Sequence, residues 1–318
     1  MENKEPFTLN FQKDNIPECV QYLYIYSEKG NSKKLKEITD NNEYSGSKIN
    51  IALRKLISKF ELNSEYEKCI YILMSLNIKI NYKYTLENSS TILMQILGKG
   101  DVYLLKLFIE ASKNTDINNT TETINFNIRD ANNRNAIHYL FIKNSIENDV
   151  IDILDYLLND YCKNNRNLYN NIIDLLDIPD LDGNVPLGIC LLKGWYNLTL
   201  KLIKLVKKTR HQNNKKNNFI HCAVLGSSIL CLKIILFYSQ KEDFKLKNCD
   251  NLTPYLLAYK NNFFQLSRII EDYDNNFYNQ IYKMSFFNES ERYLKKGYND
   301  LIINTLNYFI HGEYENLA

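Results

Sequence analysis

Histidines, cysteines and clustered carboxylates are the residues of this 318-residue chain that could act in catalysis or bind a metal. The neighbours His221 and Cys222 have the residue types of a thiol nucleophile and its base. Adjacent residues of a helix point about 100° apart, so two such side chains rarely converge on one substrate. We therefore interpret both residues as structural.

The other candidate ligands do not have the spacing of a metal site. The cluster from Asp174 to Asp182 lacks the spacing of a calcium-binding loop and is better explained as a solvated turn. Seven scattered cysteines without a C-x-x-C pair favour reduced thiols over a zinc site or a disulfide framework. No phosphate-binding loop, zinc-protease motif or nucleophile elbow occurs, so we expect no cofactor, no metal and no enzymatic activity. The cysteines are at positions 19, 69, 162, 190, 222, 231 and 249.

The charge balance argues against a nucleic-acid partner. The chain has 39 basic and 37 acidic residues, a net charge of +2, whereas binding through phosphate neutralisation usually needs a clustered basic excess. One basic run leaves two explanations open. It is either a set of cations near a helix C-terminus and a solvated loop, or a nuclear-import signal or patch for an acidic partner. The run comprises Lys201, Lys204, Lys207, Lys208, Arg210, Lys215 and Lys216.

No segment predicts a membrane span or a secretory signal. The longest apolar candidate, from Ser228 to Tyr238, is too short to cross a bilayer and contains a lysine. The first residues are charged and lack the apolar region of a signal peptide. Together with the unpaired cysteines, this predicts a cytoplasmic location, with a nuclear one as the alternative.

Two segments reveal an internal repeat. The stretches Asp180–Gly188 (DLDGNVPLG) and Asn248–Leu256 (NCDNLTPYL) each contain a polar turn and then a proline that opens a short helix. Gly194 or Asn262 ends that helix, and a second apolar helix follows. Proline suits the first turn of a helix, and Gly or Asn tolerates the left-handed conformation that reverses the chain. The pattern resembles the ankyrin repeat, which has a 33-residue period and a T-P-L-H-like signature.

The resemblance extends over residues 44–272. The family carries a histidine early in the first helix of each repeat, and we name this the anchor position. Successive anchors are 44, 50, 33 and 35 residues apart, and polar insertions at 114–125, 145–149 and 161–171 account for the long intervals. A tetratricopeptide array has a similar period but gives no reason for Asp, Gly and Pro at fixed places in the turn. The anchors are Met94, His138, Gly188, His221 and Leu256.

The sequence thus predicts an all-α, helical-hairpin solenoid of about five to seven ankyrin-like repeats with short hairpin turns. We expect an N-terminal helical cap over 1–43, the repeat array over 44–272 and a C-terminal helical cap over 273–318, with helices near 279–287 and 298–309. Asparagine occurs 45 times. At four places it occupies positions where the repeat usually has Gly, which predicts left-handed backbone there. These are Asn133, Asn144, Asn251 and Asn262.

The resemblance also implies a function and a surface. Stacked repeats present hairpin tips and first helices on a concave face, which suits binding of a protein or peptide. His138 and His221 would tie neighbouring turns together, and Trp195 is either a packing residue or an exposed anchor. The implied contact residues are Asn132, Arg134, Lys143, Asp182, Asn184, Lys193, Trp195, Lys215, Asn217, Asp250 and Lys260.

We expect a non-catalytic adaptor, complex subunit or assembly factor that is monomeric alone. Two alternatives remain. One is a nuclear regulator that uses the run Lys201–Lys216. The other is an effector enzyme with a divergent catalytic part, for which only residues 1–43 and 273–318 are left, and these are short for a catalytic domain.

Overall fold

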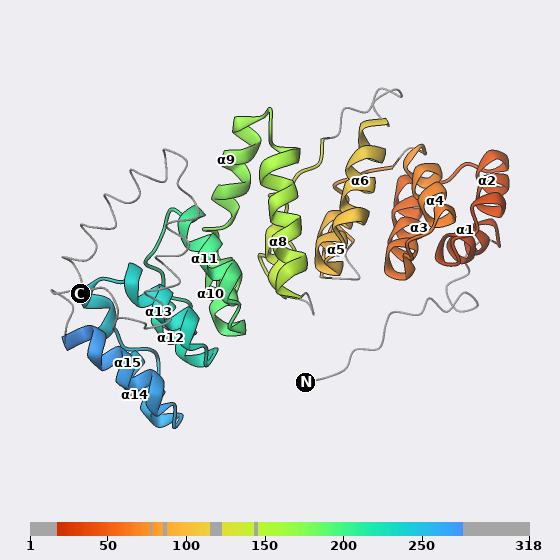
Figure 1. Cartoon of the computed structure of the whole chain (residues 1–318). Coiled ribbons are helices and arrows are strands. Elements are labelled where there is room, and N and C mark those ends of the chain that lie inside the picture. Colours follow the sequence, from red (N-terminus) through yellow and green to blue (C-terminus); the bar gives the residue numbers. More distant parts are fainter. Residues whose placement is uncertain (1–17, 77, 85–87, 115–122, 143–145, 276–318) are drawn as a thin grey trace. The chain divides into compact units, whose positions relative to one another are not determined.

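The computed structural model describes residues 18–76, 78–84, 88–114, 123–142 and 146–275 (Figure 1). Within these ranges every regular element is helical, which confirms the predicted all-α class. The chain divides into two compact units, Met1–Lys163 and Asn164–Ala318, which we call the N-terminal and C-terminal units. None of the described helices has the length and apolar character needed to cross a bilayer.

The N-terminal unit contains four helical hairpins in its described residues. The first helices of successive hairpins pack on one another, α1 on α3, α3 on α5 and α5 on α7. The second helices form a parallel row, α2 on α4, α4 on α6 and α6 on α8. A π-helical turn, η2 (Tyr156–Tyr161), continues α8. The helices are α1 (Glu18–Glu28), α2 (Ser32–Asn41), α3 (Gly46–Lys59), α4 (Ser64–Met74), α5 (Ile92–Lys99), α6 (Val102–Asn114), α7 (Ala136–Ile142) and α8 (Glu147–Asp155).

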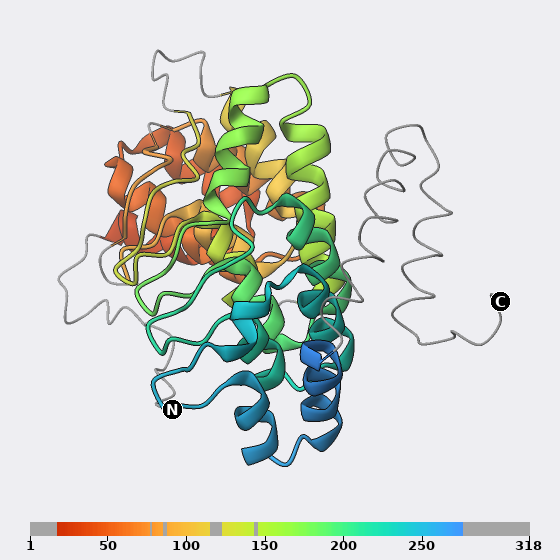
Figure 2. The same cartoon turned by 90° about the vertical axis from the view of Figure 1, so that its left-hand side faces the viewer.

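In its described residues, up to Asn275, the C-terminal unit has a single helix followed by three hairpins. Here α10 packs on α12 and α12 on α14, while α11 packs on α13 and α13 on α15. Figure 2 shows the turns of this unit projecting to one side of its helices. The elements are α9 (Arg166–Leu175), α10 (Pro186–Lys193), α11 (Tyr196–Leu205), α12 (Phe219–Leu225), α13 (Ile229–Tyr238), the 3-10 turn η3 (Lys241–Lys245), α14 (Pro254–Lys260) and α15 (Phe264–Asn275).

Short polar side chains set where the first helices begin. Thr91, Asn218 and Thr253 each accept the backbone N–H three residues ahead, at the anchor positions Met94, His221 and Leu256. Such N-caps satisfy donors that the helix itself leaves unpaired. In α10 and α14 a proline occupies the first helical position, as the repeat pattern predicts. Helix starts and anchor register therefore follow from the sequence.

Left-handed residues reverse the chain between the two helices of a hairpin. Gly100 and Gly194 have φ of 77° and 68°, and Asn262 has φ of 60°. Asn133 and Asn251, in the turns before α7 and α14, have φ of 58° and 60°, so three of the four predicted asparagines are confirmed. The fourth, Asn144, lies outside the described residues.

One prediction about the connections is wrong. Residues 161–171 were expected to form an inserted polar loop, but α9 begins at Arg166 within them. Asn165 caps this helix by accepting the N–H of Leu168 at 2.9 Å, and Ile172 and Ile173 are buried on one side of it. A high asparagine content concealed an amphipathic helix with its own cap.

Candidate protein-binding surface

The turns of the C-terminal unit share one hydrogen-bonding pattern built on an Asp or Asn side chain. In the turn before α10, Asp180 Oδ1 accepts the N–H groups of Asp182 and Asn184 at 3.0 and 2.8 Å. Asn213 and Asn248 make the same pair of bonds in the next two turns. Local side-chain bonds of this kind fix a tight turn without a partner from elsewhere. Each turn therefore holds the residue two positions after this Asp or Asn in the same way.

The presented residues form what we call the tip row, consisting of Asp182, Lys215 and Asp250. All three are exposed, and they alternate in charge along the unit. Their turns are joined through backbone, since Asn214 N donates to Asp182 O at 3.0 Å and Cys249 N donates to Lys215 O at 2.9 Å. The row is thus a regularly spaced, charged edge held by main-chain bonds.

Two histidines strengthen the link between turns. His211 Nε2 lies 2.6 Å from Gly183 O, and His221 Nε2 lies 2.9 Å from Leu252 O in the next turn. Burial lowers the pKa of His221, so the neutral ring that donates to Leu252 is favoured. His221 therefore has the turn-tying role that the repeat resemblance implies. His138 is fully buried, and its Nδ1 lies within hydrogen-bonding distance of Asn135.

The ends of the first helices add cations and apolar side chains beside the turns. Lys193 and Lys260 are exposed last residues of α10 and α14. The ammonium of Lys193 lies 4.2 Å from the centre of the half-buried Trp195 ring. Partial burial of this ammonium lowers the pKa of Lys193. Leu192 and Leu225, which the sequence interpretation did not include, are exposed at the ends of α10 and α12. The sequence did contain a signal for these two exposed leucines. Both helices are apolar on all sides, whereas packing on a core requires only one apolar face.

Two predicted contact residues hold turns together. Asn217 is 7% exposed, and its side-chain oxygen accepts from Asn248 Nδ2 at 3.1 Å. Asn184 accepts through its side chain from Asn213 Nδ2 at 2.9 Å. Both amides bond to the next turn along the unit, so we leave them out of the proposed contact set.

The N-terminal unit contains the remaining predicted contact residues. Asp130 Oδ1 accepts the N–H groups of Asn132 and Arg134 at 2.9 and 2.8 Å, which repeats the turn pattern. Both residues are half-buried, and Tyr139 donates its hydroxyl to Asp130 Oδ2 at 2.8 Å. Lys143 lies outside the described residues.

Cys222, the candidate nucleophile of the sequence, lies in a buried environment. Burial raises the pKa of Cys222 to about 12, which holds the thiol protonated and unreactive. All seven cysteines are free thiols. Among the described residues, no three His, Cys, Asp or Glu side chains are grouped as metal ligands.

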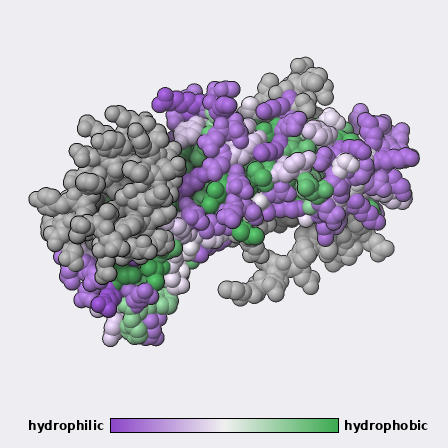
Figure 3. All heavy atoms as spheres, viewed as in Figure 1, coloured by the Kyte–Doolittle hydropathy of each residue, from purple (hydrophilic) through white to green (hydrophobic). Residues whose placement is uncertain are grey.

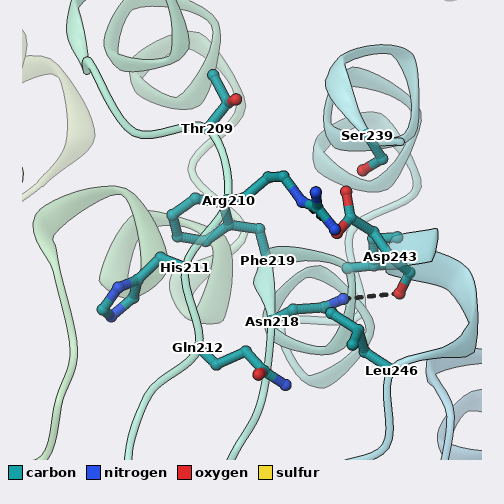
Figure 4. A pocket seen from close by; sticks show the side chains of 10 residues that line it. Thr209, Arg210, His211, Gln212, Asn218, Phe219, Ser239, Asp243 and Leu246 are labelled. Atoms are coloured by element: carbon teal, nitrogen blue, oxygen red, sulfur yellow. Dashed lines mark hydrogen bonds and ion pairs between the residues drawn. The ribbon is translucent and has the colours of Figure 1, made fainter. Parts of the chain in front are cut away.

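The basic run is partly neutralised by carboxylates of the same unit. Lys207 forms an ion pair with Asp174 and donates its backbone N–H to Asp177 at 2.8 Å. Arg210 pairs with the buried carboxylate of Asp243 at 2.9 Å. This second pair borders a pocket of about 290 Å³ formed by the chain before α12, the start of α12 and the segment around η3 (Figure 4). Part of the run thus serves to fasten the loop before α12.

Comparison with known proteins found a similar solved structure. No protein-family model matches the chain, and no curated protein sequence matches it. Among solved structures, it is similar to the ankyrin repeat domain of Bcl-3, described as a unique member of the IkappaB protein family. That match has 13% sequence identity and a TM-score of 0.48, and it covers 74% of this chain and 92% of the other. The paired helices, capped anchors and bonded turns described above have the arrangement that the repeat resemblance in the sequence implies.

Proposed function

We propose that this chain is a non-catalytic protein-binding module whose C-terminal unit contacts its partner through the tip row and the adjoining first-helix ends. The observation that carries the proposal is the tip row itself. Backbone bonds between turns hold Asp182, Lys215 and Asp250 at regular spacing, while each side chain is exposed. Positions that can vary without disturbing the core are suited to recognition.

The composition of the surface favours a polar protein or peptide target. Lys193 and Lys260 add positive charge, while Leu192 and Leu225 add exposed apolar area at the helix ends. Interfaces commonly combine a polar rim with a few apolar or aromatic contacts. The half-buried ring of Trp195 lies under the ammonium of Lys193, next to this surface. In this proposal the chain acts as an adaptor, complex subunit or assembly factor.

Affinity purification with mass spectrometry tests this assignment. The full chain should capture a reproducible, stoichiometric protein. A variant with Lys193→Glu, Lys215→Glu and Lys260→Glu should lose at least about ten-fold in apparent affinity, corresponding to ~1.4 kcal/mol. All three lysines are exposed, so we expect thermal stability to change little.

A matched control reverses three exposed cations elsewhere in the same unit. Lys204 on α11, Lys245 in η3 and Arg268 on α15 become Glu, giving the same change in net charge. Capture by this control should equal that of the natural sequence. Equal capture by both variants would show that the tip row and the helix ends do not contact the partner.

A further inference from the structure

The last hairpin exposes positions that are buried in earlier hairpins. The anchor of α14, Leu256, is 43% exposed, whereas the anchors Met94 and His221 are 0% exposed. Three residues after the anchor, Tyr259 is 56% exposed. The equivalent residues in α5, α10 and α12 are 0% exposed, and they are Leu97, Leu191 and Val224.

The reason for the burial in earlier hairpins is visible in the packing of the C-terminal unit. The first helix α12 packs on α10, and α14 packs on α12, so each is covered on the side of the following repeat. No helix of the described residues follows α15. A stacked repeat cannot bury its apolar side without a neighbour, so an array needs a terminal element that covers it.

Aromatic contacts make the exposed side of the last hairpin a defined surface. The rings of Tyr259 and Phe264 form a T-shaped pair with 5.6 Å between their centres, and Phe264 is 57% exposed. The rings of Tyr255 and Tyr259 are stacked, with 6.4 Å between their centres. We call Leu256, Tyr259 and Phe264 the end face. In Figure 3, hydrophobic atoms are visible in the region of α14 and α15.

The following part of the chain has the length and composition to cover this face. Residues 276–318 continue directly from α15 and number 43, which exceeds one 33-residue repeat. Within the unit, 13 residues separate α11 from α12 and 15 separate α13 from α14, so a connection and a helix both fit into 43. The segment has no proline. Its apolar residues recur at helical spacing, at Tyr298, Leu301, Ile302, Leu306 and Phe309.

We propose that residues 276–318 of the same chain dock on the end face, with the apolar stripe of 298–309 against Leu256, Tyr259 and Phe264. The segment then takes the place of a further repeat and closes the hydrophobic core of the C-terminal unit. This inference is independent of the proposed partner-binding surface, which consists of different residues.

Hydrogen–deuterium exchange on the full chain tests the docking. In the natural sequence, amides of residues 298–309 should exchange at least ten-fold more slowly than in an unstructured peptide of the same sequence. The pair Tyr259→Lys and Phe264→Lys should abolish this protection, because docking would bury two charges without partners. The control pair Leu62→Lys and Leu181→Lys changes two exposed leucines outside the end face and should leave protection unchanged.

Three results would overturn the inference. Exchange of 298–309 at the rate of the free peptide in the natural sequence would show that the segment does not dock. Full protection in the Tyr259→Lys, Phe264→Lys variant would place its docking site elsewhere. A concentration-dependent dimer in light scattering that this variant makes monomeric would assign the face to a second copy. If α14 itself loses protection, the milder pair Tyr259→Gln and Phe264→Gln replaces the lysines.

Discussion

Two repeats, one in each unit, place different residue types at the same position, five residues after the anchor. In the N-terminal unit this is Lys99, which donates to Ile57 O and Phe60 O at the end of α3 at 3.0 and 2.9 Å. In the C-terminal unit it is Gly226, where an added Cβ would lie 2.0 Å from Leu191 O of α10. The repeat of α5 spans the distance to the preceding first helix with a long cation, whereas the repeat of α12 brings the two backbones into close contact.

The turn before α5 differs in a similar way from the turns before the later first helices. Before α5, the buried Arg54 reaches over from α3, donates to the backbone oxygen of Ser90 and lies over the Tyr84 ring at 5.0 Å. The described turns before α10, α12 and α14, and the turn before α7 in the N-terminal unit, instead depend on a short Asp or Asn side chain within the turn itself. Long side chains can join segments that local geometry leaves apart, whereas short ones act within their own turn. The anchors of the C-terminal unit are 33 and 35 residues apart.

The largest effect should come from filling the close contact at Gly226. Gly226→Val should destabilise the chain by about 4 kcal/mol or more, since a backbone oxygen cannot yield to the new side chain. Urea unfolding followed by circular dichroism measures this. Gly188→Ala is the control, because its added Cβ would meet only Phe219 at an ordinary 3.8 Å. A loss below about 1 kcal/mol for Gly226→Val would mean that the two helices can separate freely.

Replacing Arg54 should remove the hydrogen bonds that tie α3 to the turn before α5 in the N-terminal unit. Arg54→Met keeps most of the volume but deprives Ser90 and Gln95 of their donor, at a cost of about 3 kcal/mol. Lys59→Met, an exposed change on the same helix, should cost less than about 0.5 kcal/mol. Equal unfolding midpoints in urea for the two variants would contradict a bracing role for Arg54.

A smaller loss is expected when a turn side chain of the C-terminal unit is truncated. Asp180→Ala leaves the N–H groups of Asp182 and Asn184 without their acceptor and should cost about 1–2 kcal/mol. Asp180→Asn retains the accepting oxygen, as Asn213 and Asn248 do naturally, and should be nearly neutral. Thermal unfolding of both proteins measures the difference. A similar loss for both would show that the negative charge, and not the accepting oxygen, matters at this position.

The smallest effect concerns the pH dependence of the turn link at His221. Burial lowers its pKa in the folded chain below the ordinary value of 6.5, so the unfolded state binds the proton more readily. The stabilisation is complete above the unfolded pKa and declines as the pH falls toward the folded one. Unfolding free energy should therefore fall on acidification from neutrality, by at most about 1.4 kcal/mol per pH unit from this residue. His221→Gln should give a shallower decline, and equal slopes would refute the assignment.

Much of the C-terminal unit could be predicted from the sequence because its interactions are local. Caps, anchors and left-handed residues such as Asn251 and Asn262 involve side chains that bond or adapt to their own backbone within four residues. The same reasoning missed the left-handed Lys216 and Ser227, whose residue types give no such signal. It also missed α9, because the many asparagines of this segment favoured a loop and the helical spacing of its isoleucines was not recognised.

The sequence by itself determined the helical class, the repeat register and the turns, since each depends on residues a few places apart. Only the tertiary structure showed which polar residues are exposed and which are used inside. In the structure, Asn217 is buried and accepts a hydrogen bond from Asn248 of the next turn, whereas Lys215, two positions earlier, is exposed to solvent. The tertiary structure also brought Arg54 to Ser90, 36 residues along the chain, and pressed Gly226 against Leu191. Such contacts depend on how hairpins stack, and stacking is set by the sum of many apolar contacts that no short motif encodes.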